Sequence, residues 1–391
     1  MEKFYQEVER ELNEHILPFW MKLKDKQNGG FYGEVDVDLT LNKQADKGGI
    51  ATARFLWTFS AAYRITHNSL YLEYADHLYD FLINKLYDYD NLGLYWSVDY
   101  QGNPKDTRKH VYVQSFGIYA LSEYYRVTKN EAALNLAMEL FRLIEEKGFS
   151  KATNAYMEEF DKKWTLVPNE MLSENNVLAD ITMNTHIHVL EAYTNLYKAW
   201  PNQYLKERLV SLLDVHYKYI YNHETSYLDV FFDNKWDSIL DIQSFGHDIE
   251  ASWLINAAMD VIGVKNEDYS KMITDIAYNI LNNALQDDGS LMNERVNGKV
   301  DTTRIWWVQA ETIVGFYNAF EKTKDRKFLE AVKGLWNYIK ENIVDKRPNS
   351  EWYWSVDEFG NPSTKNIGDP WKASYHNSRF CLELIERVKN E

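Results

Sequence analysis

The stretch Tyr95-Trp-Ser-Val-Asp99 leads into Gly102-Asn-Pro104, and it occurs almost unchanged a second time, as Tyr353-Trp-Ser-Val-Asp357 leading into Gly360-Asn-Pro362. Gly-Asn-Pro is typical of tight turns, so each stretch is predicted to be a short strand that ends in a turn. Four similar patches occur around residues 32, 156, 228 and 291. Aligned on residues 32, 95, 156, 228, 291 and 353, the patches are 63, 61, 72, 63 and 62 residues apart, which indicates a repeat.

Two segments with helical periodicity lie between consecutive patches. In 131–147, for example, Ala132, Leu136, Leu140 and Ile144 recur every four residues with charged residues between them. Twelve such segments are predicted, at about 2–24, 49–66, 69–87, 108–127, 131–147, 177–199, 203–221, 243–263, 266–285, 303–323, 327–343 and 372–388.

Six helical hairpins of this kind predict an all-α fold, an (α/α)6 barrel with short hairpin-like loops at one end. The even-numbered helices would line the axis and the odd-numbered helices would form the outer ring. One closed catalytic domain over 1–391 then accounts for the length. An open helical solenoid would show the same repeat, so periodicity alone leaves it as an alternative.

Composition and charge exclude several classes of partner. The chain has 43 Lys and Arg against 59 Asp and Glu, a net charge of −16, which disfavours nucleic acid. No run is apolar and long enough to span a membrane. Cys381 is the single cysteine and the first residues are too polar for a signal peptide, so we expect a cytoplasmic protein. The 13 Trp, 28 Tyr and 18 Phe suit either a bulky core or stacking on sugar rings.

Polar and aromatic residues gather in the first turns of the predicted inner helices. Because these turns face one mouth of the barrel, their side chains are expected to share a pocket, and the helix N-termini add partial positive charge there. The residues are Arg54, His110, Tyr112, Asn184, His188, His247, Glu250, Trp306, Trp307, Glu311, Trp371 and His376.

Histidines carry the chemical prediction. His188 and His247 each precede a glutamate, Glu191 and Glu250, at a spacing of three residues, which allows a carboxylate to orient the imidazole. That spacing is a weak signal, since a single histidine is more often structural. The convergence of His188, His247 and His376 from three inner helices strengthens it.

The same residues could also form other kinds of site. Three histidines from different helices also suit zinc, which stays an alternative. The chain has no nucleotide-binding glycine loop, no Gly-x-Ser-x-Gly and no cysteine pair. A glycosidase would need two opposed carboxylates, and 59 acidic residues leave that alternative open.

Six stretches resemble the N-acylglucosamine 2-epimerase superfamily, and within it the cellobiose 2-epimerase branch. The resemblance runs from about residue 10 to the C-terminus. It rests on Asn28-Gly-Gly-Phe-Tyr-Gly33, Ala45-Asp-Lys-Gly48, Thr182-Met-Asn-Thr-His-Ile-His188, Ser244-Phe-Gly-His-Asp-Ile-Glu250, Arg304-Ile-Trp-Trp-Val-Gln-Ala-Glu311 and Trp371-Lys-Ala-Ser-Tyr-His-Asn377.

The resemblance implies an (α/α)6 barrel, no cofactor and no metal, and interconversion of cellobiose with glucosyl-mannose or of lactose with epilactose. It implies that His247 and His376 are the acid and base on opposite faces of C2, that His188 assists ring opening and that Arg54 stabilises the enediolate. The residues expected to contact substrate are Tyr112, Asn184, Glu250, Trp306, Trp307, Glu311 and Trp371, with the choice between Trp306 and Trp307 left open.

Histidine and arginine suit this chemistry on physical grounds. Imidazole titrates near neutral pH, so two of them can remove and return a C2 proton, and a guanidinium stabilises oxyanions without losing its charge. Reprotonation at C1 instead would give a ketose, so an isomerase side activity is plausible. A monosaccharide epimerase, an aldose–ketose isomerase or an (α/α)6 glycoside hydrolase are the alternatives. The expected partner is a disaccharide, and we expect a monomer or weak homo-oligomer.

Overall fold

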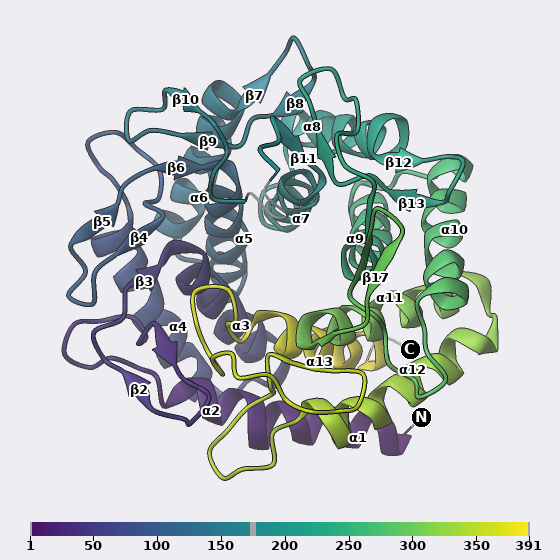
Figure 1. Cartoon of the computed structure of the whole chain (residues 1–391). Helices are drawn as coiled ribbons and strands as arrows, with labels where there is room; N and C mark the ends of the chain where they lie inside the picture. The colour runs from purple at the N-terminus through teal and green to yellow at the C-terminus, as the bar shows by residue number, and fades with distance from the viewer. Residues whose placement is uncertain (1, 173–176, 390–391) are drawn as a thin grey trace.

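Six inner helices form a closed ring in the structure, a computed structural model that describes residues 2–172 and 177–389 (Figure 1). Each inner helix packs against the next along the chain, and the last packs back against the first. This closure confirms the predicted (α/α)6 barrel and excludes the open solenoid. The inner helices are α3 (Gly49–Thr66), α5 (Val111–Thr128), α7 (Met183–Ala199), α9 (Phe245–Ile262), α11 (Trp306–Thr323) and α13 (Tyr375–Lys389).

The outer ring consists of the helices that alternate with these, and most of them end in a wider, π-helical turn. The outer helices are α1 (Glu2–Arg10) continued through Glu11–Ile16 into α2 (Leu17–Met21), α4 (Ser69–Phe81) continued by Leu82–Leu86, α6 (Glu131–Leu143) continued by Ile144–Gly148, α8 (Gln203–Val215) continued by His216–Ile220, α10 (Glu267–Asn283), and α12 (Arg326–Tyr338) continued by Ile339–Ile343.

Burial explains why the two rings differ in sequence. In the inner helix α5, every residue from Val111 to Tyr124 is buried. Outer helices such as α6 bury one face only, with Leu140 and Phe141 inside and charged residues outside. A helix surrounded by protein must be apolar or small on all sides, whereas a surface helix needs a single apolar stripe.

Short antiparallel strands gather at the end of the barrel where the inner helices begin. They are β1 (Glu34–Val35), β2 (Leu41–Asn42), β3 (Lys47–Gly48), β4 (Ser97–Val98), β5 (Pro104–Asp106), β6 (Lys109–His110), β7 (Phe149–Ser150), β8 (Ala155–Tyr156), β9 (Glu159–Phe160), β10 (Leu166–Val167), β11 (Ile181–Thr182), β12 (Tyr221–Asn222), β13 (Tyr227–Leu228), β14 (Phe231–Phe232), β15 (Ile242–Ser244), β16 (Glu294–Val296), β17 (Lys299–Asp301), β18 (Arg304–Ile305) and β19 (Ser355–Val356).

These strands join each repeat to the next. The strand that enters an inner helix pairs with a strand of the following repeat, in the pairs β3–β4, β6–β9, β11–β14, β15–β16 and β18–β19. Gly368, which lies before α13, pairs with Val35 of the first repeat. At this end of the barrel, backbone hydrogen bonds as well as helix packing therefore join the repeats into a closed ring.

Side chains from the inner helices hold the recurring patches in place. Gln114 of α5 accepts a hydrogen bond from Leu94 N and donates to Leu94 O, and Gln309 of α11 does the same at Leu291. Asp248 of α9 accepts from Leu228 N at 2.9 Å. Because these backbone groups are buried, the side chains supply partners that water cannot.

Five of the six predicted starts of the inner helices are too early by two to six residues, whereas the start predicted at residue 49 is confirmed by α3. Helices predicted from 108, 177, 243, 303 and 372 begin at Val111, Met183, Phe245, Trp306 and Tyr375. The residues just before four of these helices belong to strands β6, β11, β15 and β18, whose partners come from the next repeat.

In the described part of the chain, no helix has the length and apolar character needed to cross a membrane.

Candidate active site

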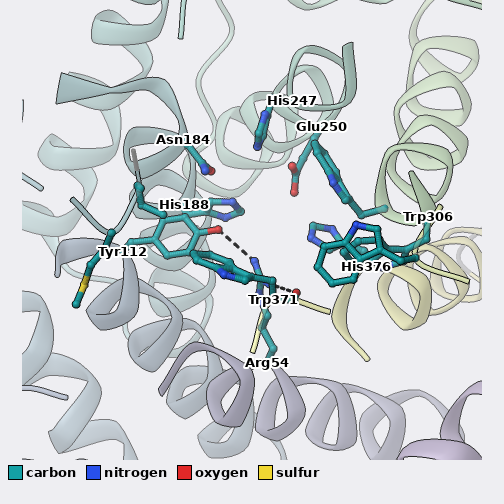
Figure 2. Close-up of a pocket in the computed structure, with 13 residues that line it drawn as sticks. Arg54, Tyr112, Asn184, His188, His247, Glu250, Trp306, Trp371 and His376 are labelled. Carbon is teal, nitrogen blue, oxygen red and sulfur yellow. Dashed lines mark hydrogen bonds between the residues drawn. The ribbon is translucent and has the colours of Figure 1, made fainter. Parts of the chain in front are cut away.

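A cavity of about 360 Å³ opens at the mouth, over the first turns of the inner helices (Figure 2). Its volume lies within the usual range for a small-molecule site. The lining residues are Arg54, Tyr112, Met171, Leu172, Asn184, His188, His247, Glu250, Trp306, Trp307, Trp354, Trp371 and His376. Of the residues predicted for the pocket, all but His110 and Glu311 line it. His110 is fully buried, and its Nε2 lies 3.3 Å from Asn169 Oδ1. Glu311 lies behind His376 and is fully buried.

The three histidines reach the cavity from three helices, His188 from α7, His247 from α9 and His376 from α13 (Figure 2). Each has its Nδ1 engaged by a neighbour. His188 Nδ1 lies 2.9 Å from Glu191 Oε2, and His376 Nδ1 lies 2.7 Å from Glu311 Oε1. In each ring, Nε2 is left as the nitrogen that can serve a ligand in the cavity.

The predicted pairing of His247 with Glu250 is wrong. His247 Nδ1 lies 2.8 Å from the hydroxyl oxygen of Ser244, while Glu250 Oε1 accepts a hydrogen bond from Arg379. The spacing of three residues places His247 and Glu250 on one helix face, but Nδ1 of His247 faces Ser244 and the carboxylate is bound by the guanidinium of Arg379. Glu250 Oε2 is buried and has no hydrogen-bond partner.

Burial keeps two of these histidines neutral near pH 7. It lowers the pKa of His247 to about 4, against the opposing effect of Glu250. It lowers the pKa of His376 well below the usual histidine value, and the charges of Arg54 and Arg379 act in the same direction. A neutral imidazole has a free lone pair, so both rings can accept a proton from a bound ligand.

Arg54 lies across the cavity from His247 and is almost fully buried (Figure 2). Its Nη1 donates to the carbonyl of Trp371 at 3.0 Å and its Nη2 donates to the hydroxyl of Tyr112 at 3.1 Å. Its guanidinium carbon lies 4.5 Å from the ring centre of Phe116. No carboxylate neutralises Arg54 by a direct ion pair among the described residues, so its charge is available to an oxyanion.

Four buried polar atoms around the cavity have no hydrogen-bond partner among the residues that the structure describes. They include two acceptors, Asn184 Oδ1 and Glu250 Oε2, and two donors, Arg54 Nε and Trp306 Nε1. Burying an unpaired donor or acceptor costs about 1–3 kcal/mol. A ligand with several hydroxyl groups can both donate and accept, so a sugar matches this set.

Both of the neighbouring tryptophans of α11 line the cavity, so the choice between Trp306 and Trp307 does not arise. The ring of Trp307 lies 4.7 Å from that of His247 and 5.5 Å from that of His376, measured between centroids. Trp307 therefore packs on both imidazole rings. Trp371 is 39% exposed at the rim, where an apolar sugar face can stack on it.

The charges behind the cavity bear on the metal alternative. In the described residues, Glu250, Glu311 and His376 form the one group whose potential ligand atoms lie within 4.8 Å of one another, and it does not include His188 or His247. Arg379 forms ion pairs with both carboxylates of this group. A guanidinium already balances their charge, so the three-histidine zinc site is not supported by this geometry.

Comparison with known proteins gives the family. The model of the N-acylglucosamine 2-epimerase family matches residues 30–379. A cellobiose 2-epimerase of Dictyoglomus turgidum is 46% identical over 384 residues, which cover 98% of each chain. The chain belongs to the N-acylglucosamine 2-epimerase family.

Two structural relatives show how far the family resemblance extends. The solved structure of cellobiose 2-epimerase from Bacillus thermoamylovorans is 57% identical, with a TM-score of 0.98 over 99% of this chain and 100% of that one. A solved D-mannose isomerase has a TM-score of 0.85 at 20% identity, over 98% of each chain, which shows the shared fold alone. The predicted family is confirmed.

Sequence reasoning missed five residues that the cavity or its base contains. Trp354 belongs to the second copy of the repeated stretch, which was interpreted only as a structural patch. Met171 and Leu172 lie in a loop without periodicity, so no sequence signal marked them. Tyr375 and Arg379 flank His376 on α13, and the position of Arg379 three residues beyond His376 was an available signal.

Proposed function

We propose that the chain is a disaccharide 2-epimerase that interconverts glucose and mannose at the reducing end of β-1,4-linked disaccharides, such as cellobiose or lactose. The observation that carries the proposal is the convergence on a single cavity of two neutral imidazoles, His376 buried and His247 half-buried, and of Arg54, which has no ion-pair partner among the described residues. The names of its relatives at 46% and 57% identity support cellobiose as the first substrate to test.

The reaction begins with ring opening, which exposes the C1 aldehyde and acidifies the C2 proton. His188, whose Nδ1 is bound by Glu191, is suited to proton transfer between the sugar oxygens through Nε2. Trp371 and the other tryptophans would hold the second ring, which supplies binding energy remote from C2.

Inversion at C2 then needs one base on each face. The Nε2 atom of one histidine, His247 or His376, takes the C2 proton, and the electron pair moves through C2–C1 onto the carbonyl oxygen. The resulting enediolate carries a negative charge, which Arg54 stabilises and which draws a proton onto the other histidine. That histidine delivers its proton to the opposite face of C2, and both rings return to their first state by exchange with solvent.

Alternative reactions differ in where the proton returns. Delivery to C1 gives a ketose, so an aldose–ketose isomerase is the second candidate, and a D-mannose isomerase of Marinomonas mediterranea is a relative at 22% identity. Glycoside hydrolysis fits less well, because Glu191, Glu250 and Glu311 are all bound to Arg379 rather than opposed across the cavity.

The proposal treats 1–391 as one catalytic domain that acts in the cytoplasm as a monomer or weak homo-oligomer. No step in it requires a metal ion or an organic cofactor. The positive charge comes from Arg54 and the proton transfers come from imidazoles.

The experiment follows the C2 proton in heavy water. The protein is incubated with cellobiose in D2O, and the products are analysed by NMR for glucosyl-mannose, ketose and deuterium at C2. We expect glucosyl-mannose with deuterium at C2, because the proton returned is not the proton removed. Retention of protium at C2 would contradict the two-histidine mechanism.

Two variants locate the bases. Replacement of either His247 or His376 by Asn should abolish epimerisation, while the remaining histidine still exchanges the C2 proton on one face of the bound sugar. The matched control is His223→Asn, because His223 is exposed and lies outside the cavity. Equal activity in all three variants would remove both histidines from the mechanism.

A further inference from the structure

Arg379 lies beneath the cavity and contacts three glutamates from three helices. It is fully buried on α13, three residues beyond His376. Its guanidinium forms ion pairs with Glu191 of α7, Glu250 of α9 and Glu311 of α11. One planar group with five donors can serve several carboxylates at once, which a lysine cannot.

Two of these glutamates are the partners of cavity histidines. Glu311 Oε1 lies 2.6 Å from a terminal nitrogen of Arg379 and 2.7 Å from His376 Nδ1, so one oxygen serves both groups. Glu191 divides its oxygens, because Oε2 faces His188 while Oε1 accepts from Arg379. The guanidinium therefore joins the His188–Glu191 and His376–Glu311 pairs.

We propose that Arg379 is a positioning residue for the epimerisation: by holding Glu191 and Glu311 ionised, it forces the Nδ1 atoms of His188 and His376 to carry their protons and turns the Nε2 lone pairs toward the sugar. An ionised carboxylate can only accept hydrogen bonds, so the imidazole nitrogen that faces it must be protonated. A protonated carboxyl group could instead donate to Nδ1, which would leave a hydrogen on Nε2 and no base facing the sugar.

The electrostatics of the two carboxyl groups agree with this role. Burial raises the pKa of Glu311, and the charge of Arg379 is the main opposing influence. For Glu191, Arg379 and His188 outweigh burial and lower the pKa to about 2. Without the guanidinium, desolvation alone would favour the protonated form of both groups.

Charged and titratable groups from α3, α7, α9, α11 and α13 surround His376 and affect its pKa. Glu250 and Glu311 favour its protonated form, while Arg379, Arg54 and His188 oppose it. When the planar guanidinium of Arg379 is lost, we expect the ionisation of Glu311 to change most, because one oxygen of Glu311 contacts both Arg379 and His376.

Glu191 and Trp253, which do not line the first cavity, line a second cavity of about 70 Å³ together with charged residues such as Arg64 and Glu123. Trp253 Nε1 donates to the other oxygen of Glu311 at 3.2 Å. The histidine partners are thus held from below by groups that do not reach the first cavity.

The inference rests on the proposed function and is tested by the pH dependence of turnover. Arg379→Lys keeps a charge but loses the planar fork, so we expect kcat for cellobiose to fall about 10²-fold at pH 7, with a much smaller change in KM. Raising the pH should recover part of kcat, because Glu311 then ionises and restores the tautomer of His376. A matched control is Arg208→Lys, which weakens the ion pair with Glu145 outside both cavities and should leave the pH profile of kcat unchanged.

Each outcome decides the proposal. A wild-type rate for Arg379→Lys, or a loss of equal size at every pH, overturns it. If Arg379→Lys does not fold, Glu311→Gln decides, because an amide cannot ionise: a loss of up to about 10⁴-fold that no pH recovers supports the role, and retained turnover overturns it. A wild-type protein without activity on any sugar would instead refute the proposed function.

Discussion

A single added methyl group at Gly246 is expected to disturb both proposed bases through one tryptophan. Gly246 lies in the first turn of α9, next to His247. A Cβ atom there would lie 2.6 Å from the Cη2 atom of Trp307 and 2.7 Å from the Cγ2 atom of Val308, whereas ordinary contacts begin at 3.4 Å, so the tryptophan ring must move by about 0.8 Å and Val308 must move as well. The Trp307 ring packs on His247 and His376 at 4.7 and 5.5 Å.

The size of the effect follows from that displacement. Misplacing a reacting group by about 1 Å can lower a rate about 10²-fold, so we expect kcat of Gly246→Ala on cellobiose to fall by about that factor, with a smaller change in KM. The fold should persist, because alanine is favoured over glycine in a helix by about 1 kcal/mol, which offsets part of the clash.

Two further variants separate this cause from a general defect. Gly334→Ala adds the same methyl group to α12, where the nearest atom is 3.8 Å away, and should leave kcat unchanged. In the Trp307→Phe background, Gly246→Ala should lower kcat by a smaller factor than in the wild type, because the smaller ring removes the contact with Trp307 while the contact with Val308 remains. Unchanged kcat in Gly246→Ala, or additive losses in the double variant, would refute the reasoning.

Three other predictions test the binding, the metal independence and the buried histidines. Trp371→Ala should lower kcat/KM for cellobiose about tenfold and affect glucose less if Trp371 stacks on the second ring as proposed; equal losses on both sugars would exclude stacking. Dialysis against a chelator should leave the rate on cellobiose unchanged, whereas a loss restored by zinc would support a metal site. For His216, burial lowers the pKa from 6.5 to about 4, so the unfolded chain binds a proton first and stability is lost as the pH falls from 6.5 to 4. Between pH 6.5 and pH 4, the free energy of unfolding measured in urea should therefore fall by about 3 kcal/mol less in His216→Leu than in the wild type. Parallel pH profiles of the free energy of unfolding would contradict the burial argument.

The helical repeat could be predicted from sequence because it depends on local periodicity and on a spacing that recurs along the chain. The starts of the inner helices could not, because residues such as Ile181 and Thr182 form a strand only when Phe231 and Phe232 of the next repeat lie beside them. A local signal was nevertheless present, since the Thr182 side chain caps α7 by accepting from Thr185 N. Partners distant in sequence decide what such short segments become.

Which residues line the site was predictable for a similar reason, and how they pair was not. The first turns of the inner helices must face one mouth once the barrel closes, so His188, His247 and His376 converge by topology alone. Glu250 follows His247 at the same spacing as Glu191 follows His188, yet only His188 and Glu191 contact each other. Arg379, which α13 brings to the axis from the far end of the sequence, binds both glutamates, so the difference lies in His247, whose Nδ1 faces the hydroxyl of Ser244 instead.

The burial that makes the histidines useful as bases also creates the need for Arg379. An imidazole removed from water stays neutral at pH 7, which gives it a free lone pair, but its tautomer is then set by whichever neighbour holds the other nitrogen. A carboxylate is the neighbour that fixes this choice, and a buried carboxylate tends to take up a proton and lose that ability. A guanidinium at the axis, reached from α7, α9 and α11 at once, keeps the carboxylates charged and so keeps the bases pointed at the sugar.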